Sequence, residues 1–267
     1  MSETCKGHSC RSSVSVDLLL GFQKFARMGS LLIALDFDGT LAPLVDDPGQ
    51  ARMCPEARDA LFKLGALPRV SVALVSGRDI ESLRSVSDPS KDWYLVGSHG
   101  AEVASPGQWD AQRTQRRVPA EIEAAFQTVV QSYPGTRLEQ KALGVALHTR
   151  GASRDLAMSA ERAARQACES FSGKLLIRTG HGILECSVSR ATKADGIAAL
   201  REATGAQAVL FAGDDATDED AIKALRSNDL GIWVGPGSSC AEYRLANPPA
   251  VAQALLVFAE ILAGLST

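Results

Sequence analysis

Two aspartates, Asp36 and Asp38, follow an apolar run in the segment LLIALDFDGTL at residues 31–41. The run predicts a buried strand, and the alternation of side chains along its end places both carboxylates on one side. Gly39 then permits a tight turn. Paired carboxylates at the end of a buried strand suit a divalent cation and covalent or acid–base chemistry. The alternative is a strand with an ordinary polar turn, because Asp and Gly are common turn residues.

A second acidic group follows another predicted strand, in the segment GDDATDEDAIKAL at residues 213–225. Acids near a helix start are favourable, and Thr217 or Asp215 could cap such a helix. Clustered anions at a strand end repel one another unless a cation compensates, so this density favours a metal site. The acidic side chains are those of Asp214, Asp215, Asp218, Glu219 and Asp220.

Two further residues occupy positions that suit a phosphate group. Ser76 ends a predicted strand in a Ser-Gly turn, where a hydroxyl and turn amides could hold phosphoryl oxygens. Lys193 begins a predicted helix, and because a cation at a helix start opposes the helix dipole, this position favours a functional cation. Each residue has an ordinary alternative, since Ser-Gly is a common turn and a lone Lys is usually a surface residue.

The elements that must position these residues alternate between strand and helix. Apolar spacing predicts a short helix at residues 15–28, the strand before Asp36, helices at 55–67 and 79–86, and strands at 69–78 and 93–97. This alternation predicts a parallel sheet covered by helices on both faces. Right-handed crossovers bring the strand ends to one edge, where chemistry collects in such sheets.

The pattern changes near residue 105, after a turn-rich break. An amphipathic helix with Ile122, Phe126 and Val129 on one face is followed by strand-like residues 136–150, a helix at 153–170 and two strands joined by a Gly-His-Gly turn. This order predicts an antiparallel sheet with helices on one face, which is a separate α+β domain.

The alternation resumes after Thr192. The segments are helix 193–203, strand 208–214, helix 217–226, strand 229–235 and helix 249–263. The α+β domain is therefore predicted to be inserted within an α/β core. The expected divisions are an N-terminal extension at 1–30, the first core part at 31–104, the inserted domain at 105–190 and the second core part at 191–267.

Composition limits the classes of protein that the chain fits. Its 267 residues, 45% of them hydrophobic, can form a sizeable core, and a net charge of −3 gives no sign of a nucleic-acid or membrane surface. The six cysteines form no CxxC pair, which predicts reduced thiols and a cytoplasmic location. Cys5, His8 and Cys10 are best explained as part of a disordered tail, because no second ligand pair follows.

Taken together in chain order, these motifs resemble the haloacid dehalogenase superfamily of phosphohydrolases. The matching residues are DFDGT at 36–40, Ser76, Lys193, and GDD with a further Asp at Asp214, Asp215 and Asp218. The resemblance implies a Rossmann-like parallel-sheet core with an inserted α+β cap domain.

The resemblance also implies a role for each matching residue. Asp36 would attack phosphorus and form an aspartyl-phosphate, and Asp38 would protonate the leaving oxygen and then activate water. Ser76 and Lys193 would hold the phosphoryl oxygens. The implied metal ligands for Mg²⁺ are the Asp36 carboxylate, the Asp38 backbone carbonyl and Asp214, with Asp218 and Asp215 close by in support.

Stretches of the core and of the inserted segment together resemble the trehalose-6-phosphate phosphatase branch of this superfamily. They are LVGSHGAE (95–102), LEQKALGVALHTR (138–150), GHGILEC (180–186), GDDATDEDAI (213–222), DFDGTLAPLVDDP (36–48) and IWVGPGSSCAEYRLANP (232–248). This resemblance implies that Glu139, Lys141, Arg150 and Glu185 bind the sugar hydroxyls. Cross-strand ion pairing is the alternative explanation for these charges. The chain departs from the branch at His181, where a Lys is usual, which leaves a sugar contact there open.

The resemblance implies a Mg²⁺-dependent phosphatase that hydrolyses trehalose 6-phosphate to trehalose and phosphate through an aspartyl-phosphate. The alternatives are a phosphatase of another sugar phosphate, such as sucrose 6-phosphate, or a non-catalytic sugar-phosphate sensor on the same fold. The expected partner is a small-molecule sugar phosphate, with neither nucleic acid nor membrane. The sequence does not fix the oligomeric state and is compatible with a monomer.

Overall fold

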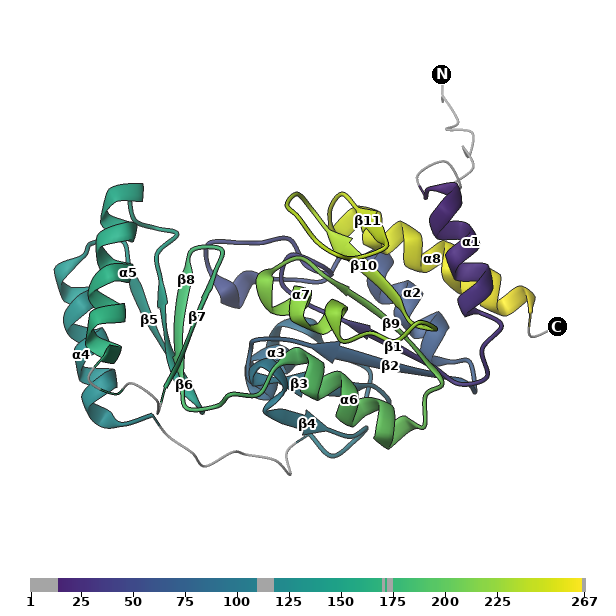
Figure 1. Cartoon of the computed structure of the whole chain (residues 1–267), viewed down its shortest axis with the longest axis horizontal. Coiled ribbons are helices and arrows are strands. Elements are labelled where there is room, and N and C mark those ends of the chain that lie inside the picture. The colour runs from purple at the N-terminus through teal and green to yellow at the C-terminus, as the bar shows by residue number, and fades with distance from the viewer. Residues whose placement is uncertain (1–13, 110–117, 170, 172–174, 266–267) are drawn as a thin grey trace, which may run out of the picture.

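The computed structural model describes residues 14–109, 118–169, 171 and 175–265. Cys5, His8 and Cys10 lie outside the described residues, as does most of the predicted extension before residue 15. Two β-sheets, each with its own helices, make up the described chain (Figure 1).

The larger sheet has seven strands and is parallel except at one edge. Across the sheet its strands are β11 (Tyr243–Leu245), β10 (Leu230–Val234), β9 (Ala208–Gly213), β1 (Leu31–Leu35), β2 (Val70–Val75), β3 (Tyr94–Gly97) and β4 (Glu102–Ala104). The central strand β1 is buried along its whole length because helices cover both faces. The expected α/β fold class with a parallel-sheet core is confirmed.

Alternation along β1 divides the core of this sheet into two layers. Leu31, Ile33 and Leu35 pack on one side with α1 (Val16–Phe25), α2 (Pro55–Gly65), α3 (Ile80–Ser87) and α8 (Pro248–Gly264). Leu32 and Ala34 pack on the other side with α6 (Lys193–Thr204) and α7 (Ala216–Lys223). Both helix layers therefore hold the sheet, and with it the strand ends, in a fixed position.

The smaller sheet is antiparallel, and its strands in spatial order are β5 (Arg137–Lys141), β6 (Gly144–His148), β8 (Ile183–Ser187) and β7 (Leu176–Gly180). The helices α4 (Ala120–Ser132) and α5 (Arg154–Glu169) pack on one face through Ile122, Phe126 and Ala164. The other face of the sheet is turned toward the core in Figure 1. All these elements fall inside the segment predicted as an insertion.

Two short edge strands, β4 and β11, were not predicted. Each has only three residues, which is too short for a period-two pattern to be recognised. The strand predicted at 69–78 ends at Val75, and the residues after it form a loop that faces the site. Two short 3-10 helices, η2 (Pro48–Gln50) and η3 (Ser98–Gly100), also lie in site loops. None of the helices in the described ranges has the length and hydrophobicity needed to cross a membrane.

Candidate active site

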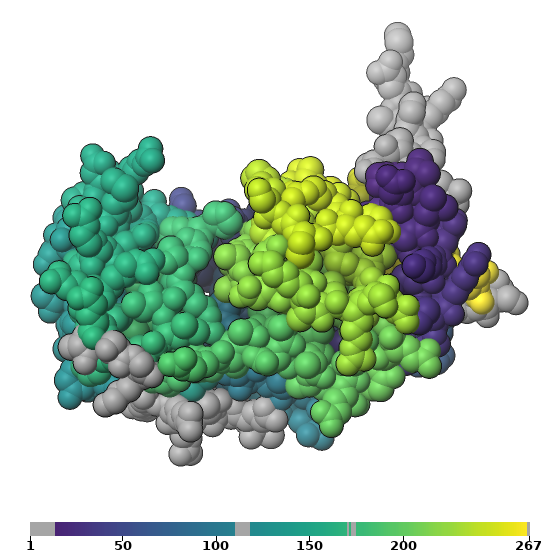
Figure 2. Space-filling view, viewed as in Figure 1, coloured from purple at the N-terminus to yellow at the C-terminus, as the bar shows by residue number. Residues whose placement is uncertain are grey.

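Side chains from β1, β2, β9 and α6 meet at the carboxyl edge of the parallel sheet. Asp36 follows β1, Ser76 follows β2, Asp214 follows β9, and Lys193 begins α6. All four line one cleft, and Glu139, Lys141, Arg150 and Glu185 of the smaller sheet and its loop line it from the opposite side. The space-filling view shows an indentation where the two lobes meet (Figure 2). The structure thus brings the predicted core and cap residues to the same cleft.

Asp36 and Lys193 form a buried ion pair at the floor of the cleft. The Lys193 Nζ donates to Asp36 Oδ1 at 2.7 Å and to Asp218 Oδ1 at 2.7 Å. The side chain of Lys193 is 3% exposed, so the two carboxylates rather than water satisfy its charge. Burial lowers the pKa of Lys193, but the charges of Asp218 and Asp36 outweigh it and hold this pKa well above its ordinary value. Lys193 is therefore a permanent cation beside Asp36.

The start of α7 explains two of the five residues in the acidic cluster, Asp215 and Asp218. Asp215 is the N-cap and accepts from the Thr217 backbone N–H at 2.8 Å, while Asp218 accepts in return from the backbone N–H of Asp215 at 3.1 Å. This reciprocal capping box satisfies helix donors that would otherwise lack partners. The helix-cap explanation thus holds for Asp215. Asp214 precedes the cap and faces Gly39, where an added Cβ would lie 2.2 Å from Asp214 Oδ2.

The carboxylates at the cleft floor differ in their ease of ionisation. Burial raises the pKa of Asp36 to about 8, with Lys193 opposing the shift and Asp214 adding to it. Burial, followed by the charges of Asp218 and Asp215, raises the pKa of Asp214 to about 7. Burial also acts on Asp215, but Lys193 and the Thr217 hydrogen bonds prevail and lower its pKa. A cation bound between Asp36 and Asp214 would relieve the repulsion that they share.

Asp36, Asp214 and Asp218 fit a hard divalent cation. Each offers a carboxylate oxygen, and these oxygens all lie within 4.8 Å of one another. The Asp36 Oδ2 is buried and has no hydrogen-bond partner among the described residues. A purely oxygen donor set of this kind suits Mg²⁺. The Asp38 side chain is not in this set, and metal binding by its backbone carbonyl stays a prediction.

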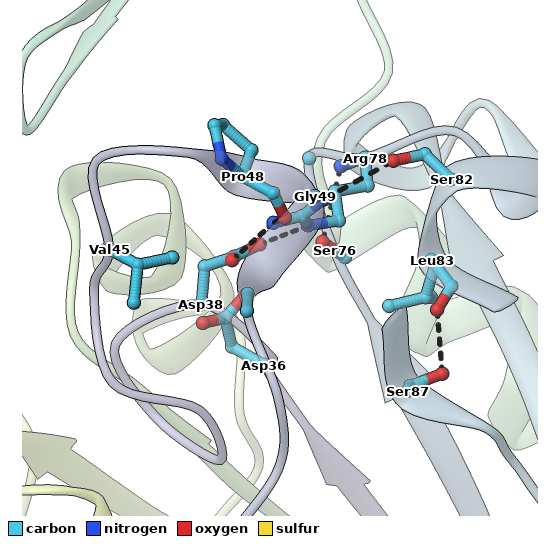
Figure 3. Close-up of polar contacts among 12 residues, drawn as sticks. Asp36, Asp38, Val45, Pro48, Gly49, Ser76, Arg78, Ser82, Leu83 and Ser87 are labelled. Carbon is cyan, nitrogen blue, oxygen red and sulfur yellow. Dashed lines mark hydrogen bonds and ion pairs between the residues drawn. The ribbon is translucent and has the colours of Figure 1, made fainter. Parts of the chain in front are cut away.

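Asp38 is held by an arginine that the sequence analysis did not single out. The guanidinium of Arg78 donates from Nε to Asp38 Oδ2 at 2.6 Å and from Nη2 to Asp38 Oδ1 at 2.7 Å (Figure 3). The carboxylate remains 32% exposed and lines the cleft. Arg78 thus fixes the orientation of the Asp38 carboxylate, and Asp38 remains accessible from the cleft that Asp36 also lines.

The loop after β2 is built from close backbone contacts. The Ser76 hydroxyl accepts from the backbone N–H of Arg78 at 3.1 Å, and the His99 backbone N–H donates to the Ser76 carbonyl at 3.0 Å. A Cβ on Gly77 would lie 2.5 Å from the His99 ring, so glycine is required there. Ser76 is 1% exposed yet lines the cleft, as a phosphate-holding hydroxyl would.

Lys141 and Glu185, both predicted sugar ligands, contact each other and the core. The Lys141 Nζ donates to Glu185 Oε2 at 2.5 Å and to the Gly77 carbonyl at 3.1 Å. His99 Nε2 lies 3.5 Å from the same Glu185 oxygen. Burial opposes the charge on Glu185, but Lys141 and His99 lower its pKa below the ordinary value. The pair therefore lies directly above the loop that carries Ser76.

Glu139 and Arg150, the other two predicted sugar ligands, also have protein partners. Glu139 Oε2 lies 2.6 Å from His148 Nε2, which gives this histidine a role as a hydrogen-bonding partner. Arg150 donates to the His181 carbonyl at 2.7 Å and to the Val45 carbonyl of the core at 2.5 Å. The four cap residues thus line the cleft, while Lys141 and Arg150 also connect the two sheets.

Arg78, Arg178 and His181 line the cleft without having been predicted as site residues. Arg78 could have been predicted from the sequence, because it lies two positions after Ser76 and therefore at the same edge of the sheet. Arg178 on β7 donates to the Ala191 carbonyl at 2.5 Å, and its buried Nη1 has no partner among the described residues. The His181 side chain is 62% exposed, with Nδ1 3.9 Å from Asp214 Oδ2. His181 lies in the turn between β7 and β8, so only the placement of this hairpin brings its side chain near Asp214.

Comparison with known proteins agrees with this geometry. The family described as Trehalose-phosphatase matches residues 34–247. The trehalose-phosphate phosphatase of Mycobacterium tuberculosis (strain H37Rv) is 32% identical over 236 residues, which cover 83% of this chain and 59% of that protein. That of Mycobacterium avium (strain 104) is 34% identical over 208 residues, covering 74% of this chain and 52% of that protein. The chain spans between half and three fifths of these relatives' lengths.

The fold is also found in a solved structure. The C-terminal domain of Candida albicans trehalose-6-phosphate phosphatase superposes with a TM-score of 0.80 at 20% identity, covering 92% of this chain and 98% of that domain. This similarity extends over both sheets and supports the fold independently of the sequence match. Since the family match includes the Asp36 turn, the inserted sheet and the Asp214 segment, the chain belongs to the trehalose-phosphatase family.

Proposed function

We propose that this chain hydrolyses trehalose 6-phosphate to trehalose and phosphate with Mg²⁺ as its cofactor. The observation that carries the proposal is a single cleft with two kinds of lining. Its floor holds the buried Asp36–Lys193 pair beside Asp214, and its roof holds the polar cap residues Lys141 and Glu185. The floor is suited to a phosphoryl group and the roof to a polyol. Family membership and the matched relatives support the same substrate.

In the proposed reaction, a carboxylate oxygen of Asp36 attacks phosphorus and the bond from phosphorus to the sugar oxygen breaks. Asp38 supplies a proton to that oxygen, and trehalose leaves. Asp38 then takes a proton from water as the water oxygen attacks phosphorus, which releases phosphate and restores the Asp36 carboxylate. Lys193 and Ser76 neutralise and position the phosphoryl oxygens throughout, which is where catalysis of phosphoryl transfer chiefly lies.

Asp36, Asp214 and Asp218 are the residues that would hold or support the metal ion. When bound, Mg²⁺ supplies charge neutralisation for the Asp36 carboxylate and the incoming phosphoryl oxygens. Burial first, and then the charges of neighbouring aspartates, raise the pKa values of Asp36 and Asp214, and a cation held between these carboxylates would favour their ionised forms. Without it, the cleft floor carries more negative than positive side chains, which disfavours a phosphate dianion.

A substrate panel tests the choice of sugar. Phosphate release from trehalose 6-phosphate, sucrose 6-phosphate and glucose 6-phosphate is to be compared by kcat/KM, with Mg²⁺ and with EDTA. We expect trehalose 6-phosphate to be preferred by at least about tenfold, because a hydrogen-bonded cap site loses about 1.4 kcal/mol or more with a poorly matched sugar. Equal or greater kcat/KM for another sugar phosphate would overturn the assignment.

Replacing the nucleophile separates an enzyme from a sugar-phosphate sensor. Asp36→Asn should lower kcat by roughly 10³-fold or more, since loss of a nucleophile removes the covalent step. The variant should still bind trehalose 6-phosphate, which calorimetry can measure. A wild-type chain that binds this ligand without releasing phosphate would instead support the sensor.

The remaining expectations form part of the same proposal. We infer a cytoplasmic enzyme that acts on a small-molecule sugar phosphate, independently of nucleic acid or membrane. The support for this location is the sequence, whose six cysteines form no CxxC pair. Fractionation of the native host, with the activity followed by substrate turnover, tests the location.

A further inference from the structure

We propose that Arg78 is the positioning residue for the acid–base carboxylate of Asp38, and that it fixes the angle at which this carboxylate meets the leaving sugar oxygen. The inference rests on the proposed phosphatase reaction and adds a residue to it. Among the described residues, the hydrogen bonds of the Arg78 guanidinium go to the Asp38 carboxylate, the Ser82 hydroxyl and the Pro48 carbonyl, and none goes to the carboxylates of Asp36, Asp214 or Asp218. The effect of Arg78 would therefore reach the reaction through Asp38.

The pairing of Arg78 with Asp38 has a defined geometry. Nε and Nη2 each contact a different oxygen of the carboxylate, at 2.6 and 2.7 Å. Two parallel hydrogen bonds of this kind fix both the place and the plane of a carboxylate, which a single contact does not. Asp38 lies in the turn after β1, where its side chain would otherwise rotate freely about χ1 and χ2.

Arg78 is itself fixed by contacts with three parts of the core. Nη2 also donates to the Pro48 carbonyl at 2.9 Å, and Nη1 donates to the Ser82 hydroxyl at 3.3 Å (Figure 3). The guanidinium carbon lies 5.8 Å from the centre of the Phe37 ring. With its side chain only 10% exposed, Arg78 has little freedom to adopt another rotamer. It is thus a rigid support rather than a mobile surface cation.

The pairing leaves Asp38 able to react. A carboxylate has about four acceptor positions, of which Arg78 occupies two, and the Asp38 side chain is still 32% exposed and lines the cleft. The proton that Asp38 donates in the first step would be carried at one of the two positions that Arg78 leaves open. Proton transfer requires the carboxylate to lie within hydrogen-bond reach of the leaving oxygen at a suitable angle. A support that holds both oxygens from the far side keeps the carboxylate directed at the substrate.

Two substrates with different leaving groups distinguish a positioning role of Arg78 from a general structural role. The first phosphoryl transfer is to be measured in single turnovers with trehalose 6-phosphate and with p-nitrophenyl phosphate, whose phenolate leaves without a proton. Arg78→Met should slow the first transfer from the sugar phosphate by roughly 10²-fold, which is the lower range of general acid catalysis. The burst of p-nitrophenolate should slow by less than about threefold, because that step does not use the Asp38 proton.

Three variants serve as controls. Arg78→Lys keeps the charge but offers no planar fork, so its selective loss on the sugar phosphate should be intermediate; it also provides the test if Arg78→Met does not fold. Arg78→Met in an Asp38→Asn background should slow the first transfer no further, since both changes remove the same contribution. Arg58→Met, at an exposed arginine that pairs with Asp88, should leave both rates unchanged.

The outcomes that overturn the inference are distinct from failure of the proposed function. If Arg78→Met and Arg78→Lys slow the first phosphoryl transfer equally with both substrates, Arg78 has a structural role only. If the transfer rate is unchanged, Asp38 needs no support from Arg78. If the rate rises, Arg78 restrains Asp38 in an unproductive position. A wild-type chain that releases phosphate from neither substrate would instead refute the phosphatase proposal itself.

Discussion

The carboxylates of Asp36, which is buried, and Asp214, which is partly buried, are harder to ionise than ordinary aspartates. Burial and neighbouring anions raise their pKa values from the ordinary 3.8 to about 8 and about 7. The folded chain therefore binds more protons than the unfolded chain in this range. By linkage, the contribution of these two groups to stability falls as the pH rises from about 4 to about 8.

A divalent cation should reverse this loss. Because it binds the ionised carboxylates, Mg²⁺ should raise the melting temperature more at about pH 8 than at about pH 6. Thermal unfolding with Mg²⁺ and with EDTA at the two pH values measures the difference. The double variant Asp36→Asn/Asp214→Asn should lose the effect, while Asp92→Asn, at an exposed site, should keep it. An equal Mg²⁺ effect at both pH values in the wild type would contradict the assignment.

The loop after β3 connects two elements of the candidate active site, the loop after β2 and the start of α6. Ser98 and His99 have positive φ angles of 49° and 55°, which only the surrounding contacts can maintain. The backbone N–H of Ser98 donates to the Arg78 carbonyl at 2.7 Å, so this loop supports the one that carries Ser76. Gly100 then packs against Thr192, the N-cap of the helix that begins with Lys193.

Gly100→Ala tests how tightly this loop is packed. An added Cβ would lie 2.0 Å from the Thr192 carbonyl oxygen, at a backbone φ of +104°. We expect a loss of more than about 2 kcal/mol in the free energy of unfolding, together with a lower kcat. Gly107→Ala is the matched control, because its φ is also positive at +70° but nothing lies within 4 Å of the added atom. Its loss should stay near 1 kcal/mol in urea unfolding; equal losses at the two sites would refute the packing argument.

At the scale of the whole molecule, the antiparallel sheet contacts the core through charged side chains. Lys141 donates to the Gly77 carbonyl, and Arg150 donates to the Val45 carbonyl. Both residues also line the cleft, so under the proposed function the same two side chains would bind the sugar and hold the two sheets together. Because Arg150 is the donor to the Val45 carbonyl, its loss should weaken this contact between the two sheets.

Arg150→Ala should increase the radius of gyration of the ligand-free chain, which X-ray scattering measures. It should also raise the KM for trehalose 6-phosphate roughly tenfold, because a hydrogen bond from a charged donor contributes about 1.5 kcal/mol or more. A residue that only bound the sugar would leave the ligand-free scattering unchanged. Arg137→Ala, at an exposed position on β5, is the matched control and should change neither quantity.

Local sequence determined the main elements and the floor of the site. Continuous apolar runs predicted β1, β2 and β9 because both faces of a parallel sheet are buried, and the strand-end rule placed Asp36, Ser76 and Asp214 at one edge. The short strands β4 and β11 were missed because three residues carry no recognisable period. Resemblance to a family, rather than spacing, supplied the assignments of Glu139 and Glu185.

Only the tertiary structure decided which partners these side chains meet. Sequence spacing could not pair Arg78 with Asp38, which lies 40 residues earlier, or direct Lys193 at two carboxylates rather than at solvent. It also could not show that Arg150 reaches the Val45 carbonyl across the cleft. The physical reason is that residue types and local periodicity determine which functional groups lie at each strand end. Packing of the helices and of the second sheet then determines which of those groups come within hydrogen-bond distance of one another.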